Sequence, residues 1–191
     1  MSASLYAQQN APVFRSNTAE IGGFVGASYG IDETRVMGGG NVCYSLIPAL
    51  MPFAEYSYFP GIQKAAATFG IPGATSSYSL PIQDVNFGLH LRVPKPRWRV
   101  IPYAVVSFGL IHNGAHTDYI NIPANPPYPA QNNVPEPISA STSFAASFGG
   151  GIRYYASEHY GFRVEVKAYK PTGNLITQVF SRVAFGFFYQ F

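Results

Sequence analysis

Apolar and polar residues alternate along most of the chain with a period of two, which is the pattern of β-strands rather than of helices. In the clearest segment, Phe162 and Val164 share one face while Arg163 and Glu165 lie on the other. Segments with this pattern are residues 19–30, 36–46, 51–59, 82–93, 98–112, 143–155, 160–170 and 178–191, of which 98–112 is apolar on both faces. The sequence therefore predicts eight strands and no long helix.

The predicted strands are longer than the ~5–6 residues that are usual in globular sheets, and they reach the ~9–11 residues that a tilted strand needs to cross a bilayer. Short links at 47–50, 94–97 and 157–159 alternate with longer ones, of which 61–80 and 113–142 are the longest. This layout is typical of a transmembrane β-barrel. We therefore expect an all-β fold, an eight-stranded antiparallel up-and-down (meander) barrel of the transmembrane type.

Alternation alone does not say which face of each strand points inward. A lipocalin-like soluble carrier would bury the apolar face, whereas a membrane barrel would turn it toward lipid. The polar faces here are rich in Gly, Ser, Ala and Asn, with few charges of both signs, which makes them a poor water-exposed surface. Because an eight-stranded interior is filled by side chains, charges placed there have to pair. The lumen charge network that we expect, with a structural role, is Glu20, Glu55, Asp84, His90, Arg92, Arg153, Arg163, Glu165, Lys167 and Arg182.

Aromatic residues gather near the predicted strand ends, as in the two aromatic girdles of a membrane barrel. The short-turn end has Tyr44, Phe53, Trp98, Tyr154, Tyr160, Tyr189 and Phe191, and the other end has Tyr29, Tyr58 and Phe144. Ordinary β propensity also favours tyrosine in strands. The girdle interpretation is preferred because it coincides with the alternation.

Composition supports a lipid environment. Charged residues make up 11% of the chain against about 25% in an average soluble domain, while 47% of residues are hydrophobic and 16% aromatic. The net charge of +3 comes from scattered residues, so we expect no nucleic-acid partner. No apolar run reaches the ~18–20 residues of a membrane helix, so contact with the bilayer interior would require a closed barrel.

The last predicted strand resembles the C-terminal signature by which the assembly machinery recognises outer-membrane proteins. The residues that carry this likeness are Phe185, Phe187, Tyr189 and Phe191. The Gly-rich segment 21–26 and Pro102-Tyr103 are similar to small bacterial outer-membrane barrels of the OmpA/OmpX type. The resemblance covers about residues 18–191, to the barrel domain only, and implies a bacterial outer-membrane location with lipid and the barrel-assembly machinery as partners. Residues 1–17 are expected to be an N-terminal extension or the remnant of a signal peptide.

Catalytic and metal-binding patterns are weak. The chain has no His-x-Ser pair and no Gly-x-Ser-x-Gly elbow, and Ser107 and His112 fall on opposite faces of one predicted strand. His112, His116 and Asp118 lie in a turn-like segment without the spacing of a zinc site, and Cys43 is the one cysteine. We expect no enzyme, no metal and no cofactor.

A basic cluster is centred on the short link at 94–97. Its members are Arg92, Lys95, Arg97 and Arg99. Two interpretations stay open for this cluster: a solvated turn, or a contact with lipid phosphates at the inner leaflet.

The two longest links carry many prolines and few charges, which fits a protein–protein contact better than a water-exposed tip. The residues expected to make such contacts are Phe69, Ile71, Pro72, Tyr78, Ile120, Ile122, Pro126, Pro127 and Tyr128. Packing of these links over the barrel mouth is the plainer alternative. The predicted function is a non-catalytic outer-membrane barrel with a structural, adhesive or surface-interaction role. The alternative is a self-assembling extracellular or surface barrel, a homo-oligomer in filaments or rings held by the N-terminal arm and the apolar loops.

Overall fold

The chain forms β-strands, and its described residues contain no helix long and apolar enough to cross a membrane. The computed structural model describes residues 16–29, 34–67, 75–95, 98–122, 124, 127, 129–173 and 179–191, without the side chains of 61–67, 75–80, 118, 120 and 136. The strands in this part of the chain are β1 (Thr18–Tyr29), β2 (Thr34–Ser45), β3 (Leu50–Ala67), β4 (Thr75–Arg92), β5 (Val100–Asn113), β6 (His116–Ile122), β7 (Gln131–Ile138), β8 (Ser141–Tyr155), β9 (Tyr160–Pro171) and β10 (Phe180–Gln190).

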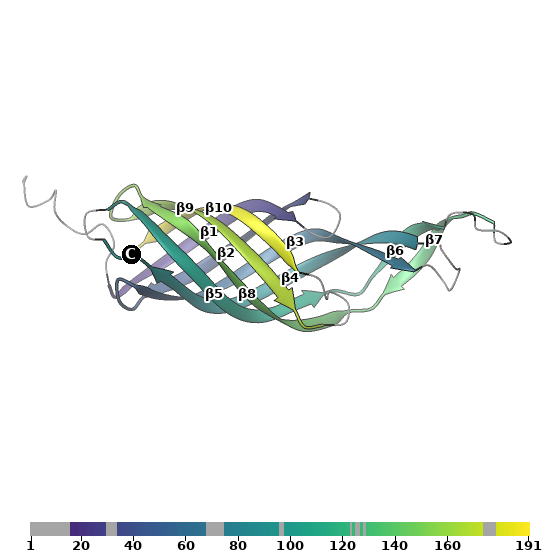
Figure 1. The fold of residues 1–191 in the computed structure, drawn as a ribbon, viewed down its shortest axis with the longest axis horizontal. Helices are drawn as coiled ribbons and strands as arrows, with labels where there is room; N and C mark the ends of the chain where they lie inside the picture. Colours follow the sequence, from purple (N-terminus) through teal and green to yellow (C-terminus); the bar gives the residue numbers. More distant parts are fainter. Residues whose placement is uncertain are drawn as a thin grey trace, which may run out of the picture.

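Eight of these strands close into an antiparallel barrel in the order β1-β10-β9-β8-β5-β4-β3-β2 (Figure 1). Each barrel strand pairs with its neighbour along the chain, except that β5 pairs directly with β8 because β6 and β7 leave the wall. The pairing of β1 with β10 runs from Glu20 opposite Gln190 to Tyr29 opposite Ser181 and leaves no open edge in the barrel. The predicted eight-stranded meander barrel is therefore confirmed.

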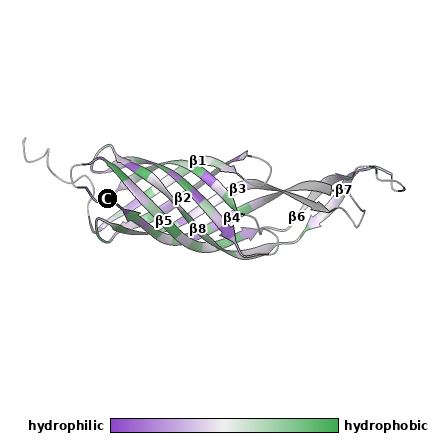
Figure 2. Cartoon of the chain, viewed as in Figure 1, coloured by the Kyte–Doolittle hydropathy of each residue, from purple (hydrophilic) through white to green (hydrophobic). Residues whose placement is uncertain are grey.

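Apolar side chains point outward from the barrel and charged ones point inward. On β9, Val164 and Val166 are 47% and 51% exposed, whereas Arg163, Glu165 and Lys167 are at most 3% exposed. Apolar positions recur along the barrel strands in Figure 2. Strand β5, which is apolar on both faces, follows the same alternation, with its odd-numbered residues buried. The predicted orientation is confirmed, and the inverse orientation of a soluble carrier is excluded.

The structure differs from the expectation of long irregular links at 61–80 and 113–142. Strands β3 and β4 continue as a paired hairpin to Ala67 opposite Thr75, past a register shift between Phe59 and Ile62. The second link contains β6 and β7, a two-stranded sheet that projects beyond the barrel at the end away from the C-terminus (Figure 1). Strands that are already paired in the wall can extend their ladder at little further entropic cost, and the sequence-based boundaries missed this continuation.

The lumen is filled by aromatic and aliphatic side chains as well as by charges. At the hairpin end, the rings of Phe59, Tyr169 and Phe180 pack together with centroid separations of 4.8–5.8 Å. Ile101, Tyr155 and Phe188 form a second cluster toward the C-terminal end. Phe188 lies where a side chain on Gly161 would stand, so glycine at 161 permits this close approach. The barrel is a packed core rather than an empty tube.

One aromatic residue was assigned to the wrong face by the girdle interpretation. Phe53 is 5% exposed and stacks on His90 inside the barrel, with ring centroids 4.4 Å apart. Its odd number places it on the inward face with Glu55 and Ser57, a phase that the clustering of aromatics at strand ends obscured. Trp98 and Tyr160 are 48% and 50% exposed at the same end of the barrel.

Substitution of Val166 by arginine is expected to destabilise the barrel in lipid far more than the same substitution at Tyr160. The two side chains are almost equally exposed, at 51% and 50%, but Val166 lies in the middle of β9 and Tyr160 at its start. Urea unfolding in phospholipid vesicles should show a loss of about 2–4 kcal/mol for Val166→Arg and about 0–1 kcal/mol for Tyr160→Arg. Equal losses would mean that the outer wall faces water.

Candidate functional site

The charged centre of the lumen is built from β3, β9 and β10. Arg182 Nη2 lies 2.8 Å from Glu55 Oε1 and 2.7 Å from Glu165 Oε1. Lys167 Nζ lies 2.8 Å from the same Glu55 oxygen and 3.9 Å from Glu165 Oε1. Arg182 and Lys167 are directly opposite each other in the β9–β10 ladder, so their two positive charges need the two carboxylates between them.

Further groups enclose this centre on the side of β4 and β5. Tyr103 Oη donates to Glu165 Oε2 at 2.8 Å, and His90 Nε2 lies 3.6 Å from the same oxygen. Arg163 Nη2 lies 3.5 Å from Glu55 Oε2. Each carboxylate thus has two or more partners, as a buried anion requires.

A separate ion pair lies nearer the C-terminal end of the barrel. Arg153 Nη1 donates to Glu20 Oε2, and the Arg153 guanidinium also lies 4.8 Å from the ring centroid of Phe188 and 3.9 Å from the Cys43 sulfur. Glu20 and Arg153 are 133 residues apart in the chain and come from β1 and β8, nearly opposite strands. The pair therefore spans the lumen.

The remaining two charged side chains of the network, Arg92 and Asp84, form hydrogen bonds with neutral groups. Arg92 donates to the hydroxyls of Tyr155, at 3.2 Å, and Ser45, and to the carbonyl of Ile47 at 3.3 Å. Asp84 accepts a hydrogen bond from the Asn86 amide. Among the described residues, no cation lies within 4.0 Å of the Asp84 carboxylate.

The structure places all ten residues of the expected lumen network inside the barrel, each at most 4% exposed. The alternation placed Cys43, Ser45, Ser57 and Asn86 on the polar faces, but the expected network did not include these neutral members or the tyrosines Tyr103 and Tyr155. Alternate residues of a strand point to the same face, so the positions of the charged residues indicate which neutral residues also point into the lumen. On β5 that signal was hidden because both faces of the strand are apolar.

The residues expected to make loop contacts are placed differently from the expectation. Phe69, Ile71, Pro72, Pro126 and Tyr128 lie outside the described residues. Tyr78 and Ile120 belong to β4 and β6 rather than to loops, and Pro127 is exposed. Ile122 is 4% exposed, so its side chain is buried rather than part of an accessible contact surface.

The C-terminal aromatic residues form a ladder on the outer wall. Phe185 and Phe187 are 53% and 44% exposed, and they stack on Phe162 and Tyr160 of β9 with centroids 5.9 Å apart. Tyr189 and Phe191 continue the ladder to the barrel rim, with centroids 5.0 Å apart. The ladder reinforces the seam beside the closing β1–β10 pair.

The histidines outside the lumen do not assemble a reactive site among the described residues. His112 Nδ1 lies 2.9 Å from Thr142 Oγ1 on the outward face, and His116 Nδ1 lies 3.0 Å from the carbonyl of Gly114. A nucleophile–base pair would use an orienting carboxylate, and none of the described side chains supplies one at the His112–Thr142 contact; the side chain of Asp118 is outside that set. No group of three metal-ligating side chains occurs in the described part of the chain.

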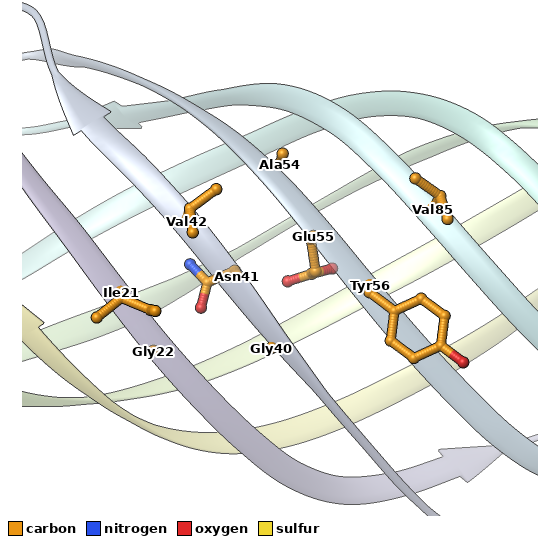
Figure 3. A pocket seen from close by; sticks show the side chains of 9 residues that line it. All are labelled: Ile21, Gly22, Gly40, Asn41, Val42, Ala54, Glu55, Tyr56 and Val85. Atoms are coloured by element: carbon orange, nitrogen blue, oxygen red, sulfur yellow. The ribbon is translucent and has the colours of Figure 1, made fainter.

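A shallow hollow of about 420 Å³ lies in the wall formed by β1, β2, β3 and β4 (Figure 3). Small residues such as Gly40 and Ala54 form its floor, and Ile21, Val42 and Tyr56 stand at its sides. These apolar side chains belong to the outward set, whereas Asn41 and Glu55, which also line the hollow, are 6% and 2% exposed, so the surface that the hollow offers is mainly apolar.

Comparison with known proteins bears on the fold. No family model and no curated protein matches the chain. The N-terminal barrel domain of Pseudomonas aeruginosa OprF matches with 15% sequence identity, 92% of this chain, 98% of that chain and a TM-score of 0.56. Neisserial surface protein A matches with 10% identity, 91% of this chain, 96% of that chain and a TM-score of 0.57. The chain therefore has the fold of the small outer-membrane barrels, as its first and last strands predict.

A double-mutant cycle on Glu20 and Arg153 tests whether the lumen charges are held by pairing. Glu20→Gln or Arg153→Met leaves an uncompensated buried charge, so each is expected to cost about 3–5 kcal/mol in the free energy of unfolding in lipid. The double variant should lose less than the sum, with a coupling of about 0.5–3 kcal/mol. Additivity within about 0.5 kcal/mol would show that the two side chains do not interact.

Proposed function

We propose that this chain is a non-catalytic outer-membrane β-barrel protein whose outer hairpins make contacts at the cell surface. The observation that carries the proposal is the combination of an apolar outer wall, a charge-paired lumen and two hairpins beyond one end of the barrel, of which β3–β4 continues the barrel ladder and β6–β7 forms a separate sheet.

The outer wall supports a location in a bilayer. Large apolar side chains cover the barrel strands with exposed fractions of about half, for example Val25 at 63%, Phe108 at 56% and Phe148 at 63%. A contiguous apolar surface of this extent on a closed barrel is stable only against lipid or protein. Closed strand barrels that span a membrane belong to the bacterial outer membrane and related membranes.

The packing of the lumen supports a structural role for this protein rather than catalysis or the passage of large solutes. Its charged groups are engaged with one another and with hydroxyls, and aromatic rings pack across it near the hairpin end. We propose that the ten charged and imidazole side chains stabilise the barrel cross-section from within. A filled eight-stranded interior leaves little room for solutes.

The β6–β7 hairpin supports a contact role. Tyr119 is 66% exposed, and it lies opposite Pro135, with Thr117 opposite Pro137. A proline nitrogen has no hydrogen, so prolines in a paired strand occupy positions whose nitrogen faces away from the partner. The outer edge of β7 therefore lacks two donors, and a partner would meet the side chains of the hairpin rather than add a strand to that edge.

The same proline positions weigh against self-assembly by strand addition at β7. The N-terminal arm invoked for filaments or rings covers residues 1–17, of which 1–15 lie outside the described residues. We retain this assembly as the alternative function. The C-terminal aromatic ladder is proposed to be read by the barrel-assembly machinery during insertion.

The first experiment tests the location and orientation of the barrel on intact bacteria that express the chain with Cys43→Ser. A membrane-impermeant maleimide is expected to label Tyr119→Cys on intact cells and Lys95→Cys only after the outer membrane is permeabilised. Labelling of both positions, or of neither, on intact cells would contradict the proposed orientation.

Deletion of residues 116–138 is expected to remove attachment of these cells to other cells while leaving the barrel folded. Asn113 and Ser141 remain paired in the wall, so the deletion leaves a short turn between β5 and β8. Gel mobility with and without boiling checks the fold, and Tyr119→Ser serves as the milder variant. Unchanged attachment by a folded, surface-located deletion variant would overturn the contact role, and filaments or rings in detergent-free material would favour the alternative.

A further inference from the structure

The turns at the C-terminal end of the barrel differ in charge. The β2–β3 turn, Leu46-Ile47-Pro48-Ala49, has no charged residue, and the β8–β9 turn has the acid Glu158. The β4–β5 turn has Lys95, Arg97 and Arg99 within five consecutive residues. Positive charge at this rim is therefore concentrated beside β4 and β5 rather than spread around the barrel.

The described part of this turn has a fixed shape. Trp98 N donates to the carbonyl of Lys95 at 2.9 Å, and Tyr155 N donates to the carbonyl of Arg99 at 2.9 Å, which ties the turn to β8. The Lys95 ammonium lies 3.9 Å from the centroid of the Trp98 ring. Arg99 Nη1 donates to the carbonyl of Ala156 at 3.3 Å. A guanidinium has five N–H donors, so most of those on Arg99 remain available for an anion.

The cations stand directly above the apolar wall. Leu91 on β4, Val93 directly after it and Val100 on β5 are 45%, 49% and 46% exposed, and Trp98, two residues before Val100, is 48% exposed. An indole at this depth is typical of the boundary between headgroups and acyl chains. A molecule that fits both parts has a negative headgroup at the level of Lys95 and Arg99 and a hydrocarbon chain along the three aliphatic side chains.

We propose that Lys95, Trp98 and Arg99 form a binding site for the phosphate of an anionic phospholipid in the leaflet at the short-turn end of the barrel. The two cations supply charge and donors to the headgroup, and the Trp98 ring holds the Lys95 ammonium at the rim. The inference rests on the proposed membrane location but not on the contact role of the hairpins. It adopts the lipid interpretation of the basic cluster for Lys95 and Arg99, whereas Arg92 is buried in the lumen and is not part of the site.

Trp98 is the single tryptophan of the chain, so its fluorescence reports on this site directly. The full chain is inserted into vesicles of phosphatidylcholine containing either brominated phosphatidylglycerol or brominated phosphatidylcholine, and quenching of Trp98 gives the relative affinity for the two lipids. Each basic residue near an anionic membrane surface strengthens binding to anionic lipid. We therefore expect the site to prefer phosphatidylglycerol over phosphatidylcholine by roughly fivefold or more. The preference should decrease in high salt, which screens exposed charges.

The double variant Lys95→Gln/Arg99→Gln should bind the two brominated lipids with nearly equal affinity, whereas Lys170→Gln, at the hairpin end of β9, should keep the native preference. Gel mobility with and without boiling verifies that each variant is folded in lipid, so loss of the barrel is distinguished from loss of the site. Equal quenching of the native chain by both lipids, or an undiminished preference in the double variant, would overturn the proposal. Loss of the preference on adding inorganic phosphate, but not sodium chloride of equal ionic strength, would identify a free-phosphate site instead and would also overturn it.

Discussion

The pairing of β1 with β10 is the constraint on which the rest of the structure depends. Once these strands join, every barrel strand has two neighbours, and the backbone groups of the wall are satisfied without water. Closure with eight strands also makes an interior too narrow for solvated charges. Glu55 and Glu165 must then be neutralised by Arg182 and Lys167, and the apolar face of each strand is left on the outside. The filled lumen follows from this closure, and the membrane location follows from the apolar faces that the closed barrel turns outward.

The number of barrel strands and the inward or outward direction of most of their residues could be predicted, because a period of two fixes the face of every residue in a strand once one charged position is known. The alternation of Val164, Glu165 and Val166 is such a case. The identity of partners could not be predicted, since Glu20 and Arg153 are 133 residues apart and meet only through closure of the sheet. The hairpins above the barrel were missed because their prolines suggested loops, although proline is tolerated where its nitrogen faces away from the ladder. Phe53 was misplaced because an aromatic residue near a strand end suits a lipid boundary and a packed lumen equally well.

The two ends of the barrel differ in structure: the short-turn end suits contact with lipid headgroups, and the hairpin end suits contact with a partner outside the membrane. The short-turn end has a compact rim with cations and an indole beside the apolar wall. At the other end, the extended β3–β4 hairpin and the separate β6–β7 sheet, which have few charges, project as paired strands past the level of the wall. Paired strands lose less entropy on binding than an irregular loop, which suits them to present side chains such as Tyr119 at a distance from the membrane. Lipid contact at one end and partner contact at the other are thus separate consequences of one barrel.

The most direct test of the account is the oxygen accessibility of nitroxide labels on successive residues of β8 in lipid, measured by electron paramagnetic resonance with Cys43→Ser as background. Labels at Ala146 and Phe148 should collide readily with oxygen dissolved in the acyl chains, whereas labels at Ala145 and Ser147 should be shielded inside the barrel. Ala145 and Ser147 are 0% and 3% exposed and Phe148 is 63% exposed, so the contrast is large. Uniform accessibility, or the opposite alternation, would contradict an apolar wall that faces lipid around a closed, charge-paired interior.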